Sequence, residues 1–339
     1  MNVLSLFDGM SCGRIALERA GIKVDKYFAS EIDKYAIEIA KKNYPDTVHL
    51  GDVQEINYPE SFDGHKIDLV IGGSPCQGFS FAGDRLDFDD PRSKLFFEYS
   101  RLVKECNPKY FLLENVRMKQ ECQDVISEIL GVRPIEINSN LVSAQNRQRL
   151  YWTNIPFNSM PMDKGICMKD ILEEKDQIED KFYYSQKSID YMERGNDKWM
   201  QAGKRRADRY AQSPQKQKSF ALTANMHKGV PYNYFEDTRQ SNNGLIMVGH
   251  ADINGHDCIK RVYHSDGKAP TMNACTGGNR EPKVAVDEKR WRKLTPTECE
   301  RLQTVPDGYT VGVSNTQRYK MLGNGWTVDV IAHLFKGIE

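Results

Sequence analysis

The sequence predicts an α/β fold in which a doubly wound sheet is joined to a smaller, loop-rich domain. Over residues 2–156, short apolar runs alternate with stretches of helical periodicity, as in a parallel sheet covered by helices. Over residues 157–287 the periodicity weakens, and Gly, Asn, Lys and Tyr become frequent. Helix signals then return. We therefore expect a larger domain at 1–156, a smaller one at 157–287, and C-terminal helices at 288–339 that return to the larger domain.

The individual elements follow from apolar runs and from signals at their ends. In chain order, we expect a strand at 3–7, a helix to Ala20 closed by Gly21, a strand at 27–30, a helix from 33 to 43 that stops before Pro45, and buried strands at 68–72, 110–113 and 150–152. Thr295, Pro296 and Glu298 then provide the N-cap, the first-turn proline and the capping-box glutamate of a further helix.

Composition restricts the function without identifying it. The chain has 339 residues and a formal net charge of +0, so binding to nucleic acid would need a local basic surface. The eight cysteines include no CxxC pair, and no signal peptide or long apolar segment is present, so we expect a cytoplasmic protein without a membrane span. His250, His256, Cys258 and His264 match no common zinc spacing, and we expect no metal.

The segment GSPCQGFS, from Gly73 to Ser80, follows a predicted strand and presents Cys76 on a loop at the strand end. Open α/β sheets bind their ligands at this edge. Pro75, Gln77 and the flanking glycines favour a fixed turn. Cys76 is therefore a candidate nucleophile, and the alternative is a buried structural thiol.

Two further groups of polar residues lie next to predicted strands. Glu114 follows the strand at 110–113 and should lie at the same sheet edge as Cys76. Arg147 and Arg149 precede the strand at 150–152. Taken singly, this glutamate could equally be a cap or a salt-bridge partner, and the arginines could form a solvated edge.

A glycine-containing loop connects the first strand to the first helix. It contains Asp8, Gly9, Met10, Ser11 and Cys12, and glycine allows the backbone to approach a ligand at a helix N-terminus. Glu31 follows the second strand, where a carboxylate can bind ribose hydroxyls, and Asp52 follows the third. An adenosine-bearing ligand is implied, but this pattern does not separate a dinucleotide from S-adenosylmethionine.

Taken in order, the motifs resemble the cytosine-5 DNA methyltransferase family over nearly the whole chain: LSLFDG, GSPCQGFS, DPRSKLFF, ENV, QNRQR, LTPTECERLQTVPD and LGNGWTV. Several segments resemble eukaryotic de novo enzymes, whereas the short length is typical of a bacterial or phage enzyme. The resemblance implies a Rossmann-like, S-adenosylmethionine-dependent methyltransferase fold. It also implies DNA (cytosine-5-)-methyltransferase activity, with a target recognition domain at 157–287.

The resemblance assigns a role to each candidate residue. Cys76 would add to carbon 6 of a flipped-out cytosine, Glu114 would protonate ring nitrogen 3, and Arg149, or else Arg147, would stabilise charge on the carbonyl at position 2. The residues implied for S-adenosylmethionine are Phe7, Asp8, Gly9, Met10, Ser11, Cys12, Glu31, Ile32, Asp52, Val53, Pro75, Leu95, Asn324 and Trp326. Three positions depart from the family pattern: Ser11 replaces a glycine, and Gly325 and Trp326 differ from the common Gly-Asn-Ser-Val form of the last motif.

The partner implied is double-stranded DNA, bound by a monomer, with a cognate restriction enzyme as a further candidate. The DNA-binding candidates are Gln77, Ser80, Lys204, Arg205, Gly278, Asn279 and Arg280. Arg280 could pair with guanine, although its turn could equally be a plain surface turn. Two other functions remain open, a transfer-RNA cytosine-5 methyltransferase and a catalytically idle DNA-binding homologue.

Overall fold

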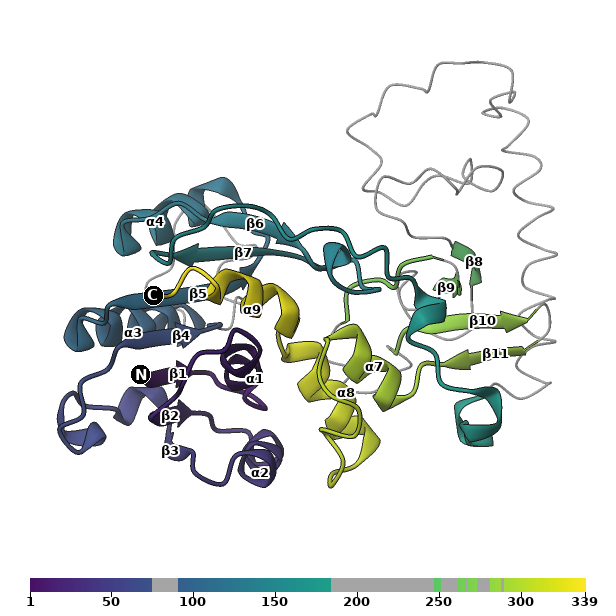
Figure 1. Cartoon of the computed structure of the whole chain (residues 1–339), viewed down its shortest axis with the longest axis horizontal. Helices are drawn as coiled ribbons and strands as arrows, with labels where there is room; N and C mark the ends of the chain where they lie inside the picture. Colours follow the sequence, from purple (N-terminus) through teal and green to yellow (C-terminus); the bar gives the residue numbers. More distant parts are fainter. Residues whose placement is uncertain (75–90, 184–246, 251–260, 266, 273–280, 288–289) are drawn as a thin grey trace, which may run out of the picture.

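The computed structural model describes residues 1–74, 91–183, 247–250, 261–265, 267–272, 281–287 and 290–339. Two sheets organise these residues (Figure 1). The larger sheet has seven strands in the order β3-β2-β1-β4-β5-β7-β6, and the smaller has four in the order β11-β10-β9-β8. The predicted doubly wound α/β fold is confirmed, because the strand order runs outward in both directions from β1 and β4.

Six of the seven strands of the larger sheet lie where the sequence predicts strands, and the strand at 135–138 was not predicted. The seven strands are β1 (Asn2–Leu6), β2 (Lys26–Ser30), β3 (Val48–Gly51), β4 (Leu69–Gly72), β5 (Tyr110–Val116), β6 (Ile135–Asn138) and β7 (Gln148–Thr153). The prediction of a parallel sheet is wrong for β7, which pairs antiparallel with both β5 and β6. As a result the start of β7, rather than its end, lies beside the end of β5.

Helices cover both faces of this sheet. The α-helices of the described residues are α1 (Cys12–Arg19), α2 (Lys34–Asn43), α3 (Pro91–Cys106), α4 (Gln120–Leu130) and, after the small sheet, α7 (Pro296–Leu302), α8 (Asn315–Asn324) and α9 (Val328–Phe335). Successive strand residues point to opposite faces. Val3 and Leu69 accordingly pack with α1, α2 and α9, whereas Leu4 and Val70 pack with α3 and α4.

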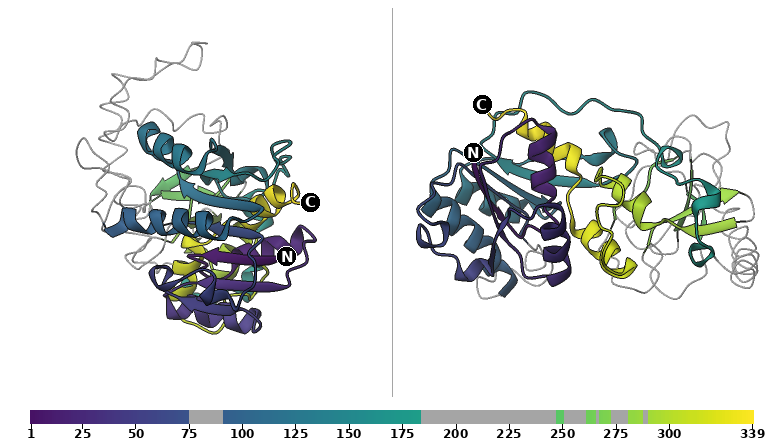
Figure 2. Two further views of the ribbon diagram at one scale, coloured as in Figure 1. Left: turned by 90° about the vertical axis from the view of Figure 1, so that its left-hand side faces the viewer. Right: turned by 60° about the horizontal axis from the view of Figure 1, so that its bottom comes forward.

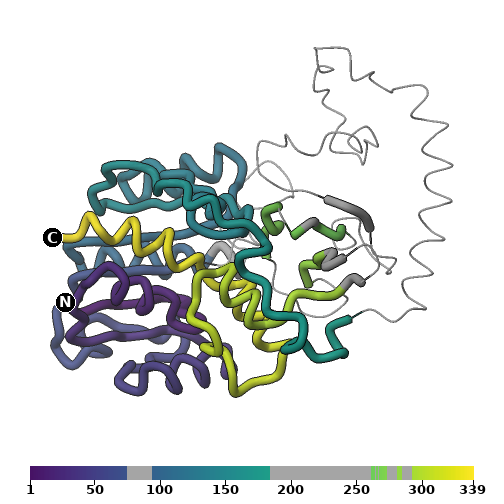
Figure 3. The backbone as a smooth tube through the Cα atoms, turned by 45° about the vertical axis from the view of Figure 1, so that its right-hand side comes forward, coloured from purple at the N-terminus to yellow at the C-terminus, as the bar shows by residue number. Residues whose placement is uncertain are grey.

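The C-terminal helix returns to the beginning of the chain. Helix α9 packs against α1, and Figure 3 shows its yellow trace beside the purple N-terminal elements. An ion pair between Arg19 and Asp329, 2.6 Å long, links the two helices. Helix α7 begins as predicted, with Thr295 as N-cap, proline in the first turn and a capping box closed by Glu298.

The smaller sheet lies to one side of the larger one (Figure 2). Its strands are β8 (Met247–His250), β9 (Arg261–His264), β10 (Lys283–Asp287) and β11 (Arg290–Lys293). Val284 and Tyr263 belong to the same continuous core as α7 and α8. Among the described residues, no helix is both long and apolar enough to cross a membrane.

Candidate functional site

The candidate site lies at the carboxyl ends of β1 and β4, where the strand order reverses direction. The two strands are paired, with Leu6 opposite Gly72, so the loops that follow them start side by side. Open α/β sheets bind ligands at such a switch point. The loop after β1 is described completely, and the loop after β4 is described as far as Ser74.

The loop after β1 has a tightly turned backbone. Phe7, Gly9 and Ser11 have φ angles of 57°, 59° and 64°, a region that residues other than glycine rarely adopt. A Cβ atom on Gly9 would meet nothing within 4 Å, so the loop is open to a ligand there. Ser11 adopts the left-handed conformation without glycine's freedom, and its hydroxyl donates a 2.5 Å hydrogen bond to Asp8.

Asp8 stabilises this loop from within. Besides the Ser11 hydroxyl, its carboxylate accepts a 2.8 Å hydrogen bond from the hydroxyl of Tyr27 on β2. Burial raises the pKa of Asp8 to about 6, although these hydrogen bonds oppose the shift. The side chain of Asp8 therefore stabilises the loop through hydrogen bonds within the protein.

The remaining residues of the loop face the C-terminal motif. The carbonyl of Met10 accepts a 2.7 Å hydrogen bond from the hydroxyl of Tyr309. Cys12 is buried, and burial raises the pKa of its thiol to about 12. A Cβ atom on Gly325 would lie 3.1 Å from Cε of Met10 and 3.2 Å from Sγ of Cys12. The C-terminal motif LGNGWTV, residues 322–328, therefore packs directly on this loop.

Glu31 joins the end of β2 to the same loop. Its Oε2 accepts a hydrogen bond from the amide of Gly9, and its Oε1 accepts from the amides of Ile32 and Asp33, each at 2.8 Å. A carboxylate can accept about four hydrogen bonds, so Oε2 retains capacity for one more. Next to it, the side chain of Ile32 is 74% exposed, which leaves an apolar surface open to a ligand.

The other predicted cofactor residues differ in accessibility. Asp52 caps a short 3-10 turn, and its carboxylate accepts a 3.0 Å hydrogen bond from the amide of Gln54. The side chain of Val53 is buried in the core, so any ligand contact there would use its main chain. Leu95 on α3 is partly buried against the core, and Asn324 is exposed at the end of α8.

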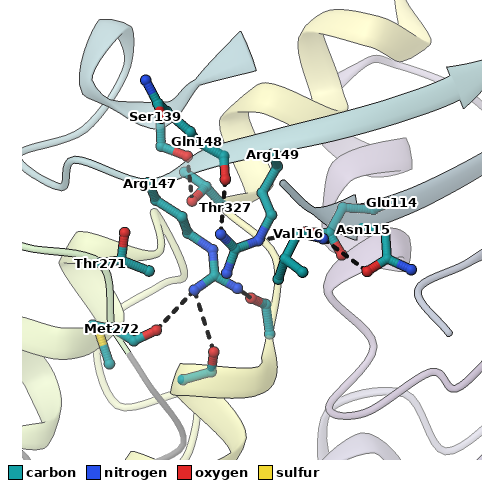
Figure 4. Close-up of polar contacts among 12 residues, drawn as sticks. Glu114, Asn115, Val116, Ser139, Arg147, Gln148, Arg149, Thr271, Met272 and Thr327 are labelled. Carbon is teal, nitrogen blue, oxygen red and sulfur yellow. Dashed lines mark hydrogen bonds and ion pairs between the residues drawn. The ribbon is translucent and has the colours of Figure 1, made fainter. Parts of the chain in front are cut away.

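The candidate acid, Glu114, is paired with Arg149. Nε of Arg149 lies 2.8 Å from Oε1 of Glu114, and the two side chains are 12% and 11% exposed (Figure 4). The antiparallel pairing of β5 and β7 produces this contact, because it sets Arg149 opposite Val116, two residues beyond Glu114. A pair that is largely removed from water has a stronger electrostatic interaction than an exposed one.

Gly73 leaves a space between this carboxylate and the indole of Trp326. A Cβ atom on Gly73 would lie 3.2 Å from Oε2 of Glu114 and 3.0 Å from Nε1 of Trp326. Trp326 also lies close to Gly13 at the start of α1. The side-chain amide of Asn115 donates a 3.3 Å hydrogen bond from Nδ2 to the carbonyl of Ser74, which ties the end of β5 to the start of the Cys76 loop.

Arg147 occupies a different environment from Arg149. It is buried, and its guanidinium donates to three main-chain carbonyls, those of Met272 at 2.9 Å, Gly323 at 3.3 Å and Gly325 at 3.0 Å. Burial lowers the pKa of Arg147 to about 10, and the neighbouring charge of Arg149 adds to the effect. The sequence leaves both arginines as candidates for stabilising charge on the base, and the structure places Arg149 alone against Glu114.

Sequence analysis did not identify a buried polar network beside Arg147. Nε2 of Gln145 donates to Oε1 of Gln303 at 3.1 Å, and the hydroxyl of Thr327 donates to the same oxygen at 2.9 Å. The available signal was the uninterrupted polar run QNRQR at 145–149, in which residues 145, 147 and 149 share one side where the chain is extended.

Several predicted site residues lie outside the described residues. They are Pro75, Cys76, Gln77, Ser80, Lys204, Arg205, Gly278, Asn279 and Arg280, together with His256 and Cys258 of the candidate metal cluster. Within the described part of the chain, no group of His, Cys, Asp or Glu side chains is arranged to hold a metal ion.

Comparison with known proteins identifies the family of the chain. Residues 1–130 and 137–339 match the family model described as C-5 cytosine-specific DNA methylase. The chain is 31% identical to the type II methyltransferase M1.ScrFI of Lactococcus lactis subsp. cremoris, over 97% of this chain and 75% of that protein. It is 30% identical to the type II methyltransferase M.HpaII of Haemophilus parainfluenzae, over 97% and 86%.

Phage proteins and solved structures are also similar. The orphan methyltransferase M.Rho11sI of Bacillus phage rho11s is 26% identical, over 99% of this chain and 97% of that protein. A putative DNA modification methyltransferase encoded within a prophage of E. coli superposes with a TM-score of 0.65 at 24% identity, covering 100% and 98% of the two chains. The S. pombe Dnmt2 methyltransferase superposes with a TM-score of 0.66 at 17% identity, covering 99% and 97%.

Proposed function

Because the chain belongs to the C-5 cytosine-specific DNA methylase family and is a DNA cytosine-5 methyltransferase, we propose that it acts through a covalent bond from Cys76 to a flipped-out cytosine. The observation that supports this most directly is the pairing of Glu114 with Arg149 beside Gly73, three residues before Cys76. An acid held in place next to the loop of a nucleophile is the arrangement that this chemistry requires.

The residues around the loop after β1 fit S-adenosylmethionine as the methyl donor. Gly9 leaves open space, Oε2 of Glu31 can accept one more hydrogen bond, as from a ribose hydroxyl, and Ile32 exposes an apolar surface suited to the adenine ring. When bound, this cofactor supplies an electrophilic methyl group on its sulfonium. We propose that Trp326, between Gly13 and Gly73, separates the cofactor loop from the site of the base.

The proposed reaction begins with activation of the ring. The thiolate of Cys76 adds to carbon 6, while Glu114 gives a proton to ring nitrogen 3, so that carbon 5 becomes nucleophilic. Arg149 holds Oε1 of Glu114 and leaves Oε2 on the side of Gly73. A fixed guanidinium in this position also stabilises negative charge on the carbonyl at ring position 2.

The later steps restore the aromatic ring. After carbon 5 has gained the methyl group, it loses its proton to water, and the electron pair of that bond re-forms the double bond as the Cys76 sulfur leaves carbon 6. Glu114 regains its proton from nitrogen 3. The target atom lies inside the base stack of a duplex, so the cytosine must first rotate out of the helix.

We also propose the division of labour inferred from the sequence. Residues 157–287 would read the target sequence, with Lys204 and Arg205 on phosphates and Gly278, Asn279 and Arg280 at base edges, while Gln77 and Ser80 contact DNA beside the nucleophile. When residues 157–287 are grafted into a related enzyme, the hybrid should methylate the target sequence of the present protein. A hybrid that keeps the specificity of the host enzyme would refute this assignment.

Bisulfite sequencing of plasmid DNA from cells that express the chain tests the function. Cytosines in one sequence context should resist conversion, and those from cells expressing Cys76→Ala should convert fully. Duplex DNA with 5-fluorocytosine at the target should form a covalent adduct with the wild-type protein, because fluorine cannot leave as a proton does. Methylation of transfer RNA but not DNA would favour the RNA alternative, and methylation by Cys76→Ala would refute the nucleophile.

A further inference from the structure

The main chain of Met272 is held by two side chains from the segment that precedes β7. Oε1 of Gln145 accepts a 2.7 Å hydrogen bond from the amide of Met272, and Nη1 of Arg147 donates a 2.9 Å hydrogen bond to its carbonyl. Between them, the amide of Asn146 donates to the carbonyl of Ala269, and the hydroxyl of Thr271 donates to the carbonyl of Asn146. The stretch 269–272 is therefore docked along 145–147 over its full length.

The same guanidinium reaches the motif that packs on the cofactor loop. Nη1 of Arg147 also donates to the carbonyl of Gly323, and Nη2 donates to the carbonyl of Gly325 (Figure 4). Gly325 in turn packs on Met10 and Cys12. One buried side chain thus connects the loop proposed to hold the cofactor with a stretch of the part proposed to read DNA.

We propose that Arg147 is a positioning residue that couples cofactor binding to DNA binding. This inference rests on the proposed function. A buried guanidinium that loses one acceptor leaves a donor unpaired at a substantial cost, so the positions of Met272 and Gly325 depend on each other. A ligand that fixes the motif at 323–325 therefore also favours the docked arrangement of 269–272. Thermodynamic linkage then requires DNA binding to increase the affinity for the cofactor by the same factor.

The test measures how much S-adenosylhomocysteine, the product of the cofactor, increases the affinity of the protein for DNA. The affinity for a duplex oligonucleotide containing the target is determined with and without saturating S-adenosylhomocysteine, for wild type, Arg147→Lys and Thr271→Val. In the wild type, S-adenosylhomocysteine should increase the affinity for DNA by a factor of about 5 to 150, and we call this ratio the coupling factor. Arg147→Lys should bring that factor close to one, because a single ammonium cannot serve three carbonyls in the geometry of the planar guanidinium.

Thr271→Val is the matched control. It removes one 2.6 Å hydrogen bond from the same docked stretch, and that bond goes to Asn146 and not to the motif at 323–325. The coupling factor should survive this change. If the role of Arg147 is merely structural, Arg147→Lys should lower the affinities for S-adenosylhomocysteine and for DNA but leave the coupling factor unchanged. That result would overturn the proposal.

Hydrogen exchange of the wild-type protein provides a test that does not depend on folding of the variant. Binding of S-adenosylhomocysteine in the absence of DNA should slow exchange at the amide of Met272, which is bonded to Gln145. Unchanged exchange at this amide, in a protein that still binds the product and methylates DNA, would overturn the coupling alone. A protein that binds neither the product nor DNA would overturn the proposed function as well.

Discussion

Arg149 holds the carboxylate of Glu114 through a 2.8 Å contact between Nε and Oε1, in a position where both side chains are nearly buried. The contact fixes one carboxylate oxygen and leaves Oε2 beside Gly73. Removing one partner of such a pair leaves a charge without compensation in a poorly solvated place. The substitutions that test the acid must therefore preserve the shape of the site.

Glu114→Gln should lower the rate of methyl transfer by about 10²- to 10⁴-fold, because glutamine keeps the shape of the side chain but has no carboxylic proton to give. Single-turnover transfer into duplex DNA measures this rate. Glu136→Gln is the control, since that side chain is 42% exposed and lies 3.8 Å from Arg117. A Glu114→Gln rate within about threefold of the wild type would remove Glu114 from the mechanism.

Gly73→Ala should reduce methyl transfer by about tenfold or more while costing about 1 to 3 kcal/mol of stability. The new Cβ atom would crowd Oε2 of Glu114 at 3.2 Å and Nε1 of Trp326 at 3.0 Å, so one of them must move. Transfer rates and chemical denaturation measure the two effects.

Gly131→Ala is the matched control for Gly73→Ala. Gly131 closes α4 with φ 72° and has open space around it, so alanine there costs about 1 to 2 kcal/mol through backbone strain alone. Its transfer rate should stay at the wild-type level. Equal losses of activity in the two variants would mean that the Gly73 effect reflects stability only.

The sequence predicted those features that depend on local patterns. Local patterns predicted every strand of the larger sheet except β6, and Thr295 with Glu298 predicted the start of α7, because caps and periodicity are encoded within a few residues. The direction of β7 was not predictable in this way, since it depends on pairing with β5 about forty residues earlier in the chain. The distinct surroundings of Arg147 and Arg149 also depend on distant segments, namely Met272 and the motif at 323–325.

Ile32→Ser should weaken binding of S-adenosylmethionine by about 1 to 2 kcal/mol, because the adenine would lose an apolar contact surface. Stability should change by less than about 0.5 kcal/mol, since the side chain is 74% exposed. Titration calorimetry and denaturation measure the two quantities. Val311→Ser, at a side chain that is 49% exposed, is the control and should leave the affinity unaltered. An unaltered affinity in Ile32→Ser would place the adenine elsewhere.

Glu31→Ala should weaken cofactor binding by about 1 to 3 kcal/mol, the scale expected when hydroxyls lose a charged acceptor. The same change also releases the amides of Gly9, Ile32 and Asp33, so the loop should lose stability as well. Glu31→Gln retains one acceptor oxygen for these amides and should fall between alanine and the wild type in both measurements. If Glu31→Ala binds the cofactor with wild-type affinity, the ribose contact is wrong.

Asp8 gives a prediction for stability as a function of pH. Its pKa rises from an ordinary value of 3.8 to about 6 in the folded protein, chiefly through burial. Between these two values the folded state binds more protons than the unfolded state, so the contribution of Asp8 to stability decreases as the pH rises.

The variant Asp8→Asn removes this titration while keeping the shape of the side chain, so that contributions of other groups cancel in the comparison with the wild type. The free energy of unfolding of Asp8→Asn minus that of the wild type should therefore increase between pH 4 and pH 7. The increase should reach up to about 3 kcal/mol, since each pH unit between the two pKa values contributes about 1.4 kcal/mol. Urea denaturation at half-unit intervals of pH measures this difference. A difference that stays flat, or that decreases as the pH rises, would show that the pKa of Asp8 is not raised in the folded protein and that burial does not govern it.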